Sequence, residues 1–137
     1  MDILDIYTYI YPYFGLIIFN QGKSSYSIPA NVASIQREIM KNGPVITVFR
    51  VYTDFMYYKT GVYTQNIETL QYTWGYLHGA HTAKIIGWGV DGVDYWLAAN
   101  SYNTDWGEKG FFRIRRGINE CGFEERIYAG DVMLENV

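Results

Sequence analysis

The sequence predicts an α+β fold that is mostly β-sheet, with one helix near residues 32–41. Two observations support this prediction. Apolar residues recur at helical spacing in one early segment, and the later segments are short and rich in β-branched and aromatic residues. Turn residues separate the later segments, which favours antiparallel strands. The 137 residues are enough for one domain with its own hydrophobic core.

The predicted helix begins after Asn31 and ends before Gly43. Asn31 has a side chain that commonly caps a helix N-terminus. Ile35, Ile39 and Met40 follow at helical spacing, so one face of the helix is expected to be apolar. Gly43 and then Pro44 stand in the order that typically ends a helix.

Six segments after the helix are expected to form strands, and one polar segment before it is expected to be a loop. The loop is QGKSSYS at residues 21–27, because its composition is polar and rich in serine. The strand segments are enriched in Val, Ile, Tyr, Phe and Trp. They are VITVFRVY, the end of TDFMYYKTGVYTQ, AKIIGWGV, VDYWLAAN, GFFRIRRG and ERIYAGDVML.

The first twenty residues are apolar and rich in tyrosine. Asp2 and Asp5 stand where a signal peptide would carry positive charge, so no signal peptide is recognised. Pro12 and several tyrosines interrupt what a membrane span would need as a continuous apolar run. We therefore expect residues 1–20 to be an extension and expect no membrane partner; the alternative is an uncleaved anchor.

Charge and cysteine content limit the classes of function. The net charge is −3, which gives no reason to expect binding to nucleic acid. The single cysteine, Cys121, cannot form a disulfide within the chain and does not indicate a redox compartment.

A histidine and an asparagine end two neighbouring predicted strands. His81 begins one strand and Asn100 ends the next, so an antiparallel pairing would bring the two side by side. An amide oxygen that accepts from an imidazole N–H can hold a catalytic base in one orientation. A histidine and an asparagine across a hairpin are also common as a purely structural pair, and the spacing alone leaves both interpretations open.

His78 raises a metal site as a third interpretation. His78 and His81 are three residues apart, a spacing that could bind zinc on a helix. The strand context and the lack of a nearby Cys or carboxylate cluster argue against it. No metal or cofactor is expected.

Long stretches of the sequence resemble the C-terminal half of a papain-family cysteine peptidase of the cathepsin B type. These stretches are residues 42–63 and 79–132, and the resemblance covers residues 24–132. It rests on a histidine followed by an apolar strand and GWG, then YWL and AN, then TDWGE and GFF. Residues 1–20 resemble no part of this family.

The resemblance implies a fold and a reaction. Residues 21–137 would be the C-terminal, β-rich lobe of the papain-like fold, a partly open antiparallel barrel that faces a second lobe across a cleft. The reaction would be hydrolysis of a peptide bond through an acyl-enzyme, on a peptide or protein substrate. His81 would be the general base and Asn100 the residue that orients it. The family also implies a lysosomal or extracellular location.

The family's nucleophilic cysteine belongs to the other lobe, after a CGSCW-like stretch that this sequence does not contain. Cys121 lies in NECGFEE, which resembles a family segment downstream of the asparagine, so we expect a structural thiol there. The chain alone is therefore predicted to be inactive, with a Cys-bearing N-terminal lobe as a partner. The alternative is a non-catalytic remnant that binds peptides or a partner protein.

The sequence departs from the family pattern around the pair. Tyr102 stands where the family has a tryptophan that covers the histidine–asparagine bond, while Trp106 matches the family. Ala80 and Thr82 flank the histidine, and the resemblance implies that both contact substrate, with Thr82 narrowing the S2 pocket. Arg126 stands where cathepsin B-type enzymes have a glutamate at the floor of that pocket, and a positive charge there would favour acidic or neutral side chains. The alternative is that Arg126 extends into solvent and does not form part of the pocket.

Overall fold

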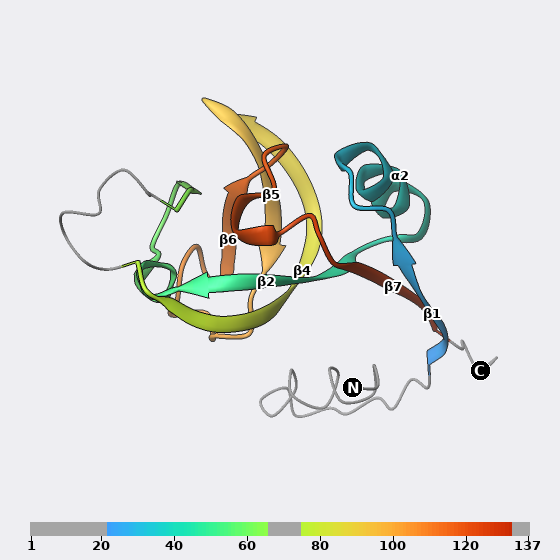
Figure 1. Cartoon of the computed structure of the whole chain (residues 1–137), viewed down its shortest axis with the longest axis horizontal. Coiled ribbons are helices and arrows are strands. Elements are labelled where there is room, and N and C mark those ends of the chain that lie inside the picture. The colour runs from blue at the N-terminus through green and yellow to red at the C-terminus, as the bar shows by residue number, and fades with distance from the viewer. Residues whose placement is uncertain (1–21, 66–74, 133–137) are drawn as a thin grey trace.

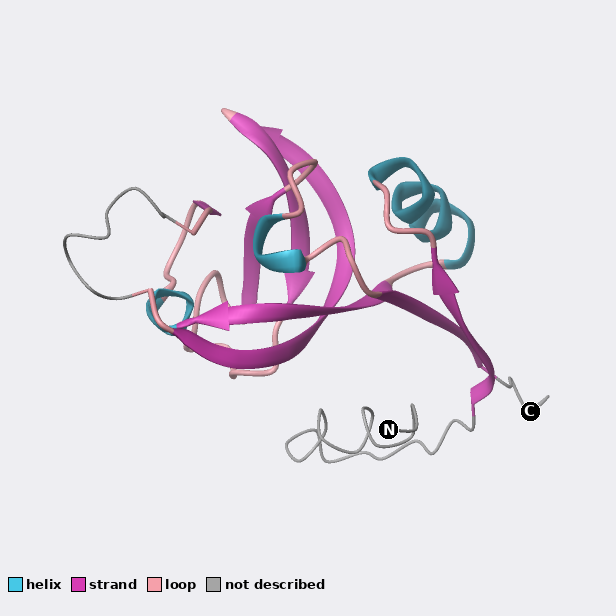
Figure 2. Cartoon of the chain, viewed as in Figure 1, coloured by secondary structure: helices cyan, strands magenta, loops and turns pink. Residues whose placement is uncertain are grey.

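The computed structural model describes residues 22–65 and 75–132. Seven strands form one sheet in the order β1-β7-β2-β4-β5-β6-β3, and a single α-helix lies beside β1 in these ranges (Figure 1). The elements are β1 (Gly22–Ile28), α2 (Val32–Asn42), β2 (Val45–Tyr52), η1 (Thr53–Tyr57), β3 (Val62–Tyr63), β4 (Leu77–Asp91), β5 (Val93–Ala99), β6 (Phe111–Arg115), η3 (Glu120–Gly122) and β7 (Ile127–Val132). The predicted β-rich α+β fold is confirmed, and Figure 2 shows how strongly strands predominate.

The long strand β4 bends the sheet into a partly closed form. Its first half pairs with β2 and its second half with β5, with a register shift between Ile85 and Gly87. Figure 1 shows β4 curving around the side of the molecule. Among the described strands, all pairings are antiparallel except the short β3–β6 pairing, which is parallel and which the sequence did not predict.

The prediction of a loop at residues 21–27 is wrong, because β1 begins at Gly22 and pairs with β7. β1 lies at the edge of the sheet, so its outward side chains can be polar. Ser25 and Ser27 are exposed, whereas Tyr26 is half-buried and Ile28 is buried. This alternation of exposed and buried side chains is typical of a strand, but the serine-rich composition led to the prediction of a loop. The predicted extension at 1–20 lies outside the described residues.

Helix α2 begins at the predicted residue, Val32, and ends at Asn42, one residue beyond the predicted range. Asn31 Oδ1 accepts from the backbone N–H of Ser34 at 2.9 Å, and Gly43, with φ of 99°, ends the helix. Ile35 is fully buried and anchors the helix to the sheet. None of the helices in the described ranges has the length and apolar character that crossing a bilayer requires.

The core lies inside the curve of the sheet and is largely aromatic. On β2, Val45, Phe49 and Val51 point inward at alternate positions. The Phe49 ring contacts the rings of Phe55 and Phe123 in edge-to-face geometry at 5.5 and 5.0 Å. Such pairs stabilise by about 0.5–1.5 kcal/mol each beyond the burial of their area.

A buried carboxylate fixes the connection between β6 and β7. Glu124 Oε1 accepts from the Trp96 indole N–H at 2.8 Å and from the Gly117 backbone N–H at 2.7 Å, and Oε2 accepts from the Asn119 backbone N–H at 3.2 Å. The side chain of Trp96 is fully buried. Glu124 therefore determines the path of the segment that carries Cys121 and leads into β7.

Replacing Glu124 by alanine should destabilise the fold strongly. The substitution leaves three N–H donors without an acceptor, two of them on Oε1, and we expect the free energy of unfolding to fall by about 3 kcal/mol or more. Glu124→Gln keeps one acceptor oxygen and should lose clearly less. Urea unfolding followed by tryptophan fluorescence measures both variants, and equal losses would contradict this role of the carboxylate.

Candidate active site

Strand pairing brings His81 and Asn100 together. His81 lies in β4, and Asn100 directly follows β5, whose last residue Ala99 pairs with Lys84 of β4. His81 Nε2 lies 2.8 Å from Asn100 Oδ1, a hydrogen-bond distance. The antiparallel geometry proposed from the sequence is therefore present.

The hydrogen bonds of Asn100 determine which imidazole nitrogen carries the proton. Asn100 Oδ1 also accepts from the Ser101 backbone N–H at 2.8 Å, which fixes the orientation of the amide. Because this oxygen can only accept, Nε2 of His81 must donate. The neutral ring therefore has its lone pair on Nδ1, the nitrogen that can take a proton.

Aromatic rings hold the imidazole on two sides. The Tyr102 ring stacks on His81 with ring centroids 4.8 Å apart and an interplanar angle of 26°. Phe49, the residue directly opposite His81 in the β2–β4 register, presents its ring at 5.9 Å in edge-on geometry. Trp106 meets Tyr102 at 5.3 Å, and its indole N–H donates to the Met56 carbonyl oxygen at 3.0 Å.

Burial among these rings lowers the pKa of His81 below its ordinary value of 6.5, while the hydrogen bond to Asn100 partly opposes the shift. The ring is therefore neutral, in the form of a base, at pH 7. Since the unfolded chain binds this proton more readily, the contribution of His81 to stability falls as the pH drops below about 6.5 and through the lower folded-state pKa.

Of the three residues predicted to contact substrate, two lie on β4 and the third lies beside the adjacent strand β2. Ala80 and Thr82 point away from the His81 face, because side chains alternate along a strand. Thr82 pairs with Val48 of β2, and the Val48 backbone N–H donates to the Arg126 carbonyl oxygen at 3.1 Å. Arg126 itself is exposed.

Sequence reasoning missed two residues next to the site. Arg50 is paired with Ala80 in the register, and its NH2 group lies 3.2 Å from Glu125 Oε1, beside Arg126. Phe49 supports the imidazole from the core. The alternation within VITVFRVY was the available signal, since it assigns Phe49 and Arg50 to opposite faces of β2.

Cys121 has the surroundings of a structural thiol. Its side chain is buried, and Sγ lies 3.5 Å from Glu120 Oε1. Burial, followed by the negative charge of Glu120, raises the pKa of Cys121 well above its ordinary value. A thiol in this environment ionises poorly and is a weak nucleophile.

The alternative of a metal pair at His78 and His81 has no helix to support it. Both residues lie in strand β4, where residues three apart point to opposite faces. His78 is exposed, and within residues 22–65 and 75–132 no three His, Cys, Asp or Glu side chains are grouped so that they could hold a metal ion.

A histidine with a fixed tautomer, an amide that orients it and an aromatic cover are the features that the base half of a nucleophilic hydrolase site requires. Residues 17–130 match the papain family of cysteine proteases. The chain belongs to this family.

Individual relatives and a solved structure agree with this assignment. The chain is 54% identical over 112 residues to cathepsin B-like cysteine proteinase 3 of Ostertagia ostertagi, covering 81% of this chain and 60% of that protein. It is 51% identical over 110 residues to a gut-specific cysteine proteinase of Caenorhabditis elegans, covering 80% of this chain and 31% of that protein. The structure of procathepsin B S9 from Trypanosoma congolense superposes with a TM-score of 0.73 at 37% identity, over 84% of this chain and 37% of that one.

NMR titration of His81 tests the geometry of the pair. We expect a pKa below 6.5, and ¹⁵N shifts of the neutral ring that place the proton on Nε2. Asn100→Ala removes the acceptor, so the neutral ring should populate both tautomers. A proton on Nδ1 in the unsubstituted chain, or a pKa above 6.5, would contradict the proposed arrangement. The exposed His78 provides an internal reference signal.

Proposed function

We propose that this chain is the His/Asn-bearing portion of a cathepsin B-like cysteine peptidase that hydrolyses peptide bonds. The observation that carries the proposal is the 2.8 Å contact between His81 Nε2 and Asn100 Oδ1, which leaves Nδ1 as the free base. Family membership supports the same reaction, and peptides or proteins are the substrate class. No cofactor is needed.

His81 acts twice in the proposed reaction. Its Nδ1 takes the proton of a cysteine thiol, and the thiolate attacks the carbonyl carbon of the scissile bond. The imidazolium then gives this proton to the departing amine, the C–N bond breaks, and a thioester remains. His81 then takes a proton from water, whose oxygen attacks the thioester carbonyl carbon; the C–S bond breaks, and the imidazolium returns the proton to the cysteine sulfur. Asn100 keeps the ring oriented, and Tyr102 and Trp106 exclude water from their hydrogen bond.

The thiol is proposed to come from a Cys-bearing N-terminal lobe. The sequence contains one cysteine, and Cys121 is buried beside Glu120 with a raised pKa. The chain spans 60% of the length of the Ostertagia relative and 37% of the solved procathepsin B chain, which leaves room for such a lobe in the relatives. Since Cys121 is the only thiol here, a non-catalytic role in binding peptides or a partner is the second candidate function.

The substrate side of the site is proposed to favour acidic or neutral side chains. Ala80 and Thr82 flank the base along β4 with their side chains on the opposite face of the strand, and the Arg126 backbone bonds to the neighbouring strand β2. Arg50 adds a second positive charge near this face, while Glu125 offsets one of the two. A net positive charge disfavours basic substrate side chains.

The proposed location is lysosomal or extracellular. The family resemblance supports it, and so does the relative in Caenorhabditis elegans that is named for the gut. The single cysteine, Cys121, is free, so no disulfide forms within the chain.

The 137-residue chain alone should show no hydrolysis of fluorogenic dipeptide or tripeptide substrates, because nucleophile and base act as one unit. Mixing it with the Cys-bearing N-terminal lobe of a cathepsin B-like enzyme should restore activity. His81→Ala should abolish the restored activity, and Asn100→Ala should reduce it less. Activity of the chain alone that disappears with Cys121→Ser would contradict the proposal and identify Cys121 as the nucleophile.

Substrate preference in the reassembled enzyme tests Arg126. Arg126→Glu should raise kcat/KM for substrates with arginine at the P2 position and lower it for those with glutamate, by about tenfold each for a charge reversal worth about 1.4 kcal/mol. Arg37→Glu, an exposed charge reversal on α2, serves as the control. An unchanged ratio between the two substrates would exclude Arg126 from the substrate site.

A further inference from the structure

We propose that Glu108 is a positioning residue for His81, which it supports through the loop that carries Tyr102 and Trp106. The catalytic meaning of this role rests on the proposed function, but the structural coupling between Glu108 and His81 does not. Glu108 lies in the connection between β5 and β6, and its carboxylate contacts the segment that follows η1.

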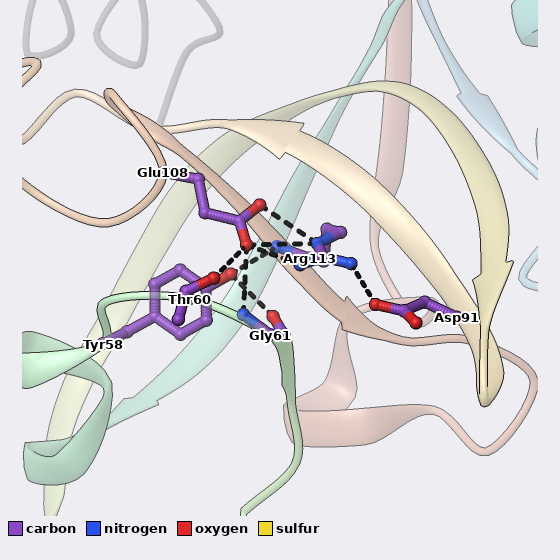
Figure 3. Close-up of polar contacts among 6 residues, drawn as sticks. All are labelled: Tyr58, Thr60, Gly61, Asp91, Glu108 and Arg113. Carbon is purple, nitrogen blue, oxygen red and sulfur yellow. Dashed lines mark hydrogen bonds and ion pairs between the residues drawn. The ribbon is translucent and has the colours of Figure 1, made fainter.

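The Glu108 carboxylate joins three segments of the chain (Figure 3). Oε1 accepts from the Thr60 hydroxyl at 2.8 Å and from the Gly61 backbone N–H at 3.0 Å. The Arg113 guanidinium of β6 donates to both carboxylate oxygens, from NH2 to Oε1 at 2.6 Å and from Nε to Oε2 at 3.0 Å. The carboxylate therefore ties the β5–β6 connection to the η1–β3 turn and to β6. Bidentate pairs of this kind are among the stronger ion pairs.

Further contacts hold the Arg113 side chain in place. Its NH1 group donates to Asp91 Oδ2 at 2.6 Å, and the guanidinium lies over the Tyr95 ring at 5.4 Å. The hydrogen bond from Arg113 is the main reason that the pKa of Glu108 falls to about 2. Glu108 therefore stays ionised down to about pH 2, and its contribution to stability is lost as the pH falls from about 4.5 toward about 2.

The loop that Glu108 anchors has a conformation with little intrinsic stability. Asn103 and Lys109, neither of them glycine, have φ of 78° and 57°. Gly107 has φ of 58°, and a Cβ there would lie 2.6 Å from the Phe111 carbonyl oxygen. Left-handed backbone at residues other than glycine costs free energy and persists only where surrounding contacts impose it. The Glu108 carboxylate supplies such contacts.

A continuous series of ring contacts connects this anchor to the imidazole. The Tyr58 hydroxyl donates to the Gly61 carbonyl oxygen at 2.7 Å, next to the Glu108 carboxylate. The Tyr58 ring meets the Trp106 ring at 5.4 Å, Trp106 meets Tyr102 at 5.3 Å, and Tyr102 stacks on His81 at 4.8 Å. Loosening the anchor should therefore move Trp106 and Tyr102 and admit water to His81.

NMR of the full chain with Glu108→Gln tests this coupling. We expect the His81 pKa to shift upward toward 6.5, because added hydration relieves the burial that depresses it. Loss of a negative charge alone would shift this pKa downward, so the direction separates loosening from electrostatics. We also expect the signal of the hydrogen-bonded Nε2 proton to weaken through faster exchange with water.

Asp94→Asn is the matched control. It also removes one negative charge and one carboxylate partner of an arginine, since Asp94 Oδ2 lies 3.2 Å from Arg116 NH2. It should not raise the His81 pKa, and it should leave the Nε2 proton signal unchanged. If Glu108→Gln does not fold, Thr60→Val removes a single hydrogen bond to the carboxylate and should produce the same changes to a smaller extent.

The outcomes are distinct. A folded Glu108→Gln variant whose His81 pKa and Nε2 signal match those of Asp94→Asn would overturn the proposal, and so would an unchanged Thr60→Val variant if Glu108→Gln is unfolded. Activity is not needed for either measurement, so the coupling can hold even if the proposed peptidase function fails. In the reassembled enzyme, Glu108→Gln should lower kcat more than it changes KM.

Discussion

The packing of Phe49 against its neighbours is the constraint on which the rest of this structure depends. Its ring lies in the core against Phe55 and Phe123, and it stands opposite His81 in the β2–β4 register. The strand register of a sheet is strongly specified, because a shift of one residue would turn every side chain of β4 to the other face. Burial of the Phe49 side of β2 thus fixes the face from which His81 emerges.

Besides the aromatic core, two carboxylates stabilise the structure by fixing loops between strands. Glu124 organises the connection between β6 and β7, and Glu108 organises the connection between β5 and β6. Each accepts several hydrogen bonds from segments far apart in the sequence, so each fixes a loop that has little regular structure of its own. Irregular loops thereby acquire the rigidity that a positioned side chain requires.

The environment of His81 favours the neutral form of the imidazole, which is the form that a general base requires. Burial keeps the imidazole neutral, and Asn100 keeps the proton on Nε2, so Nδ1 is free. In a complete peptidase a nearby thiolate would favour the imidazolium and raise its pKa. Cys121 does not supply this charge, because burial and Glu120 hold its own proton in place. The same physical effect, desolvation, therefore keeps the histidine unprotonated and the cysteine protonated.

Local patterns in the sequence determined the helix at α2, the main strands and the pairing of His81 with Asn100, because these depend on periodicity, capping and the geometry of tight turns. The family motifs also indicated the cover formed by Tyr102 and Trp106. The edge strand β1, the parallel β3–β6 pairing and the roles of Glu108, Arg50 and Phe49 were decided only by the tertiary structure. Their partners are distant in sequence: Thr60 and Gly61 lie far before Glu108, and Glu125 far after Arg50. No local pattern carries such contacts, because they arise only when the folded sheet brings separate segments within hydrogen-bonding distance.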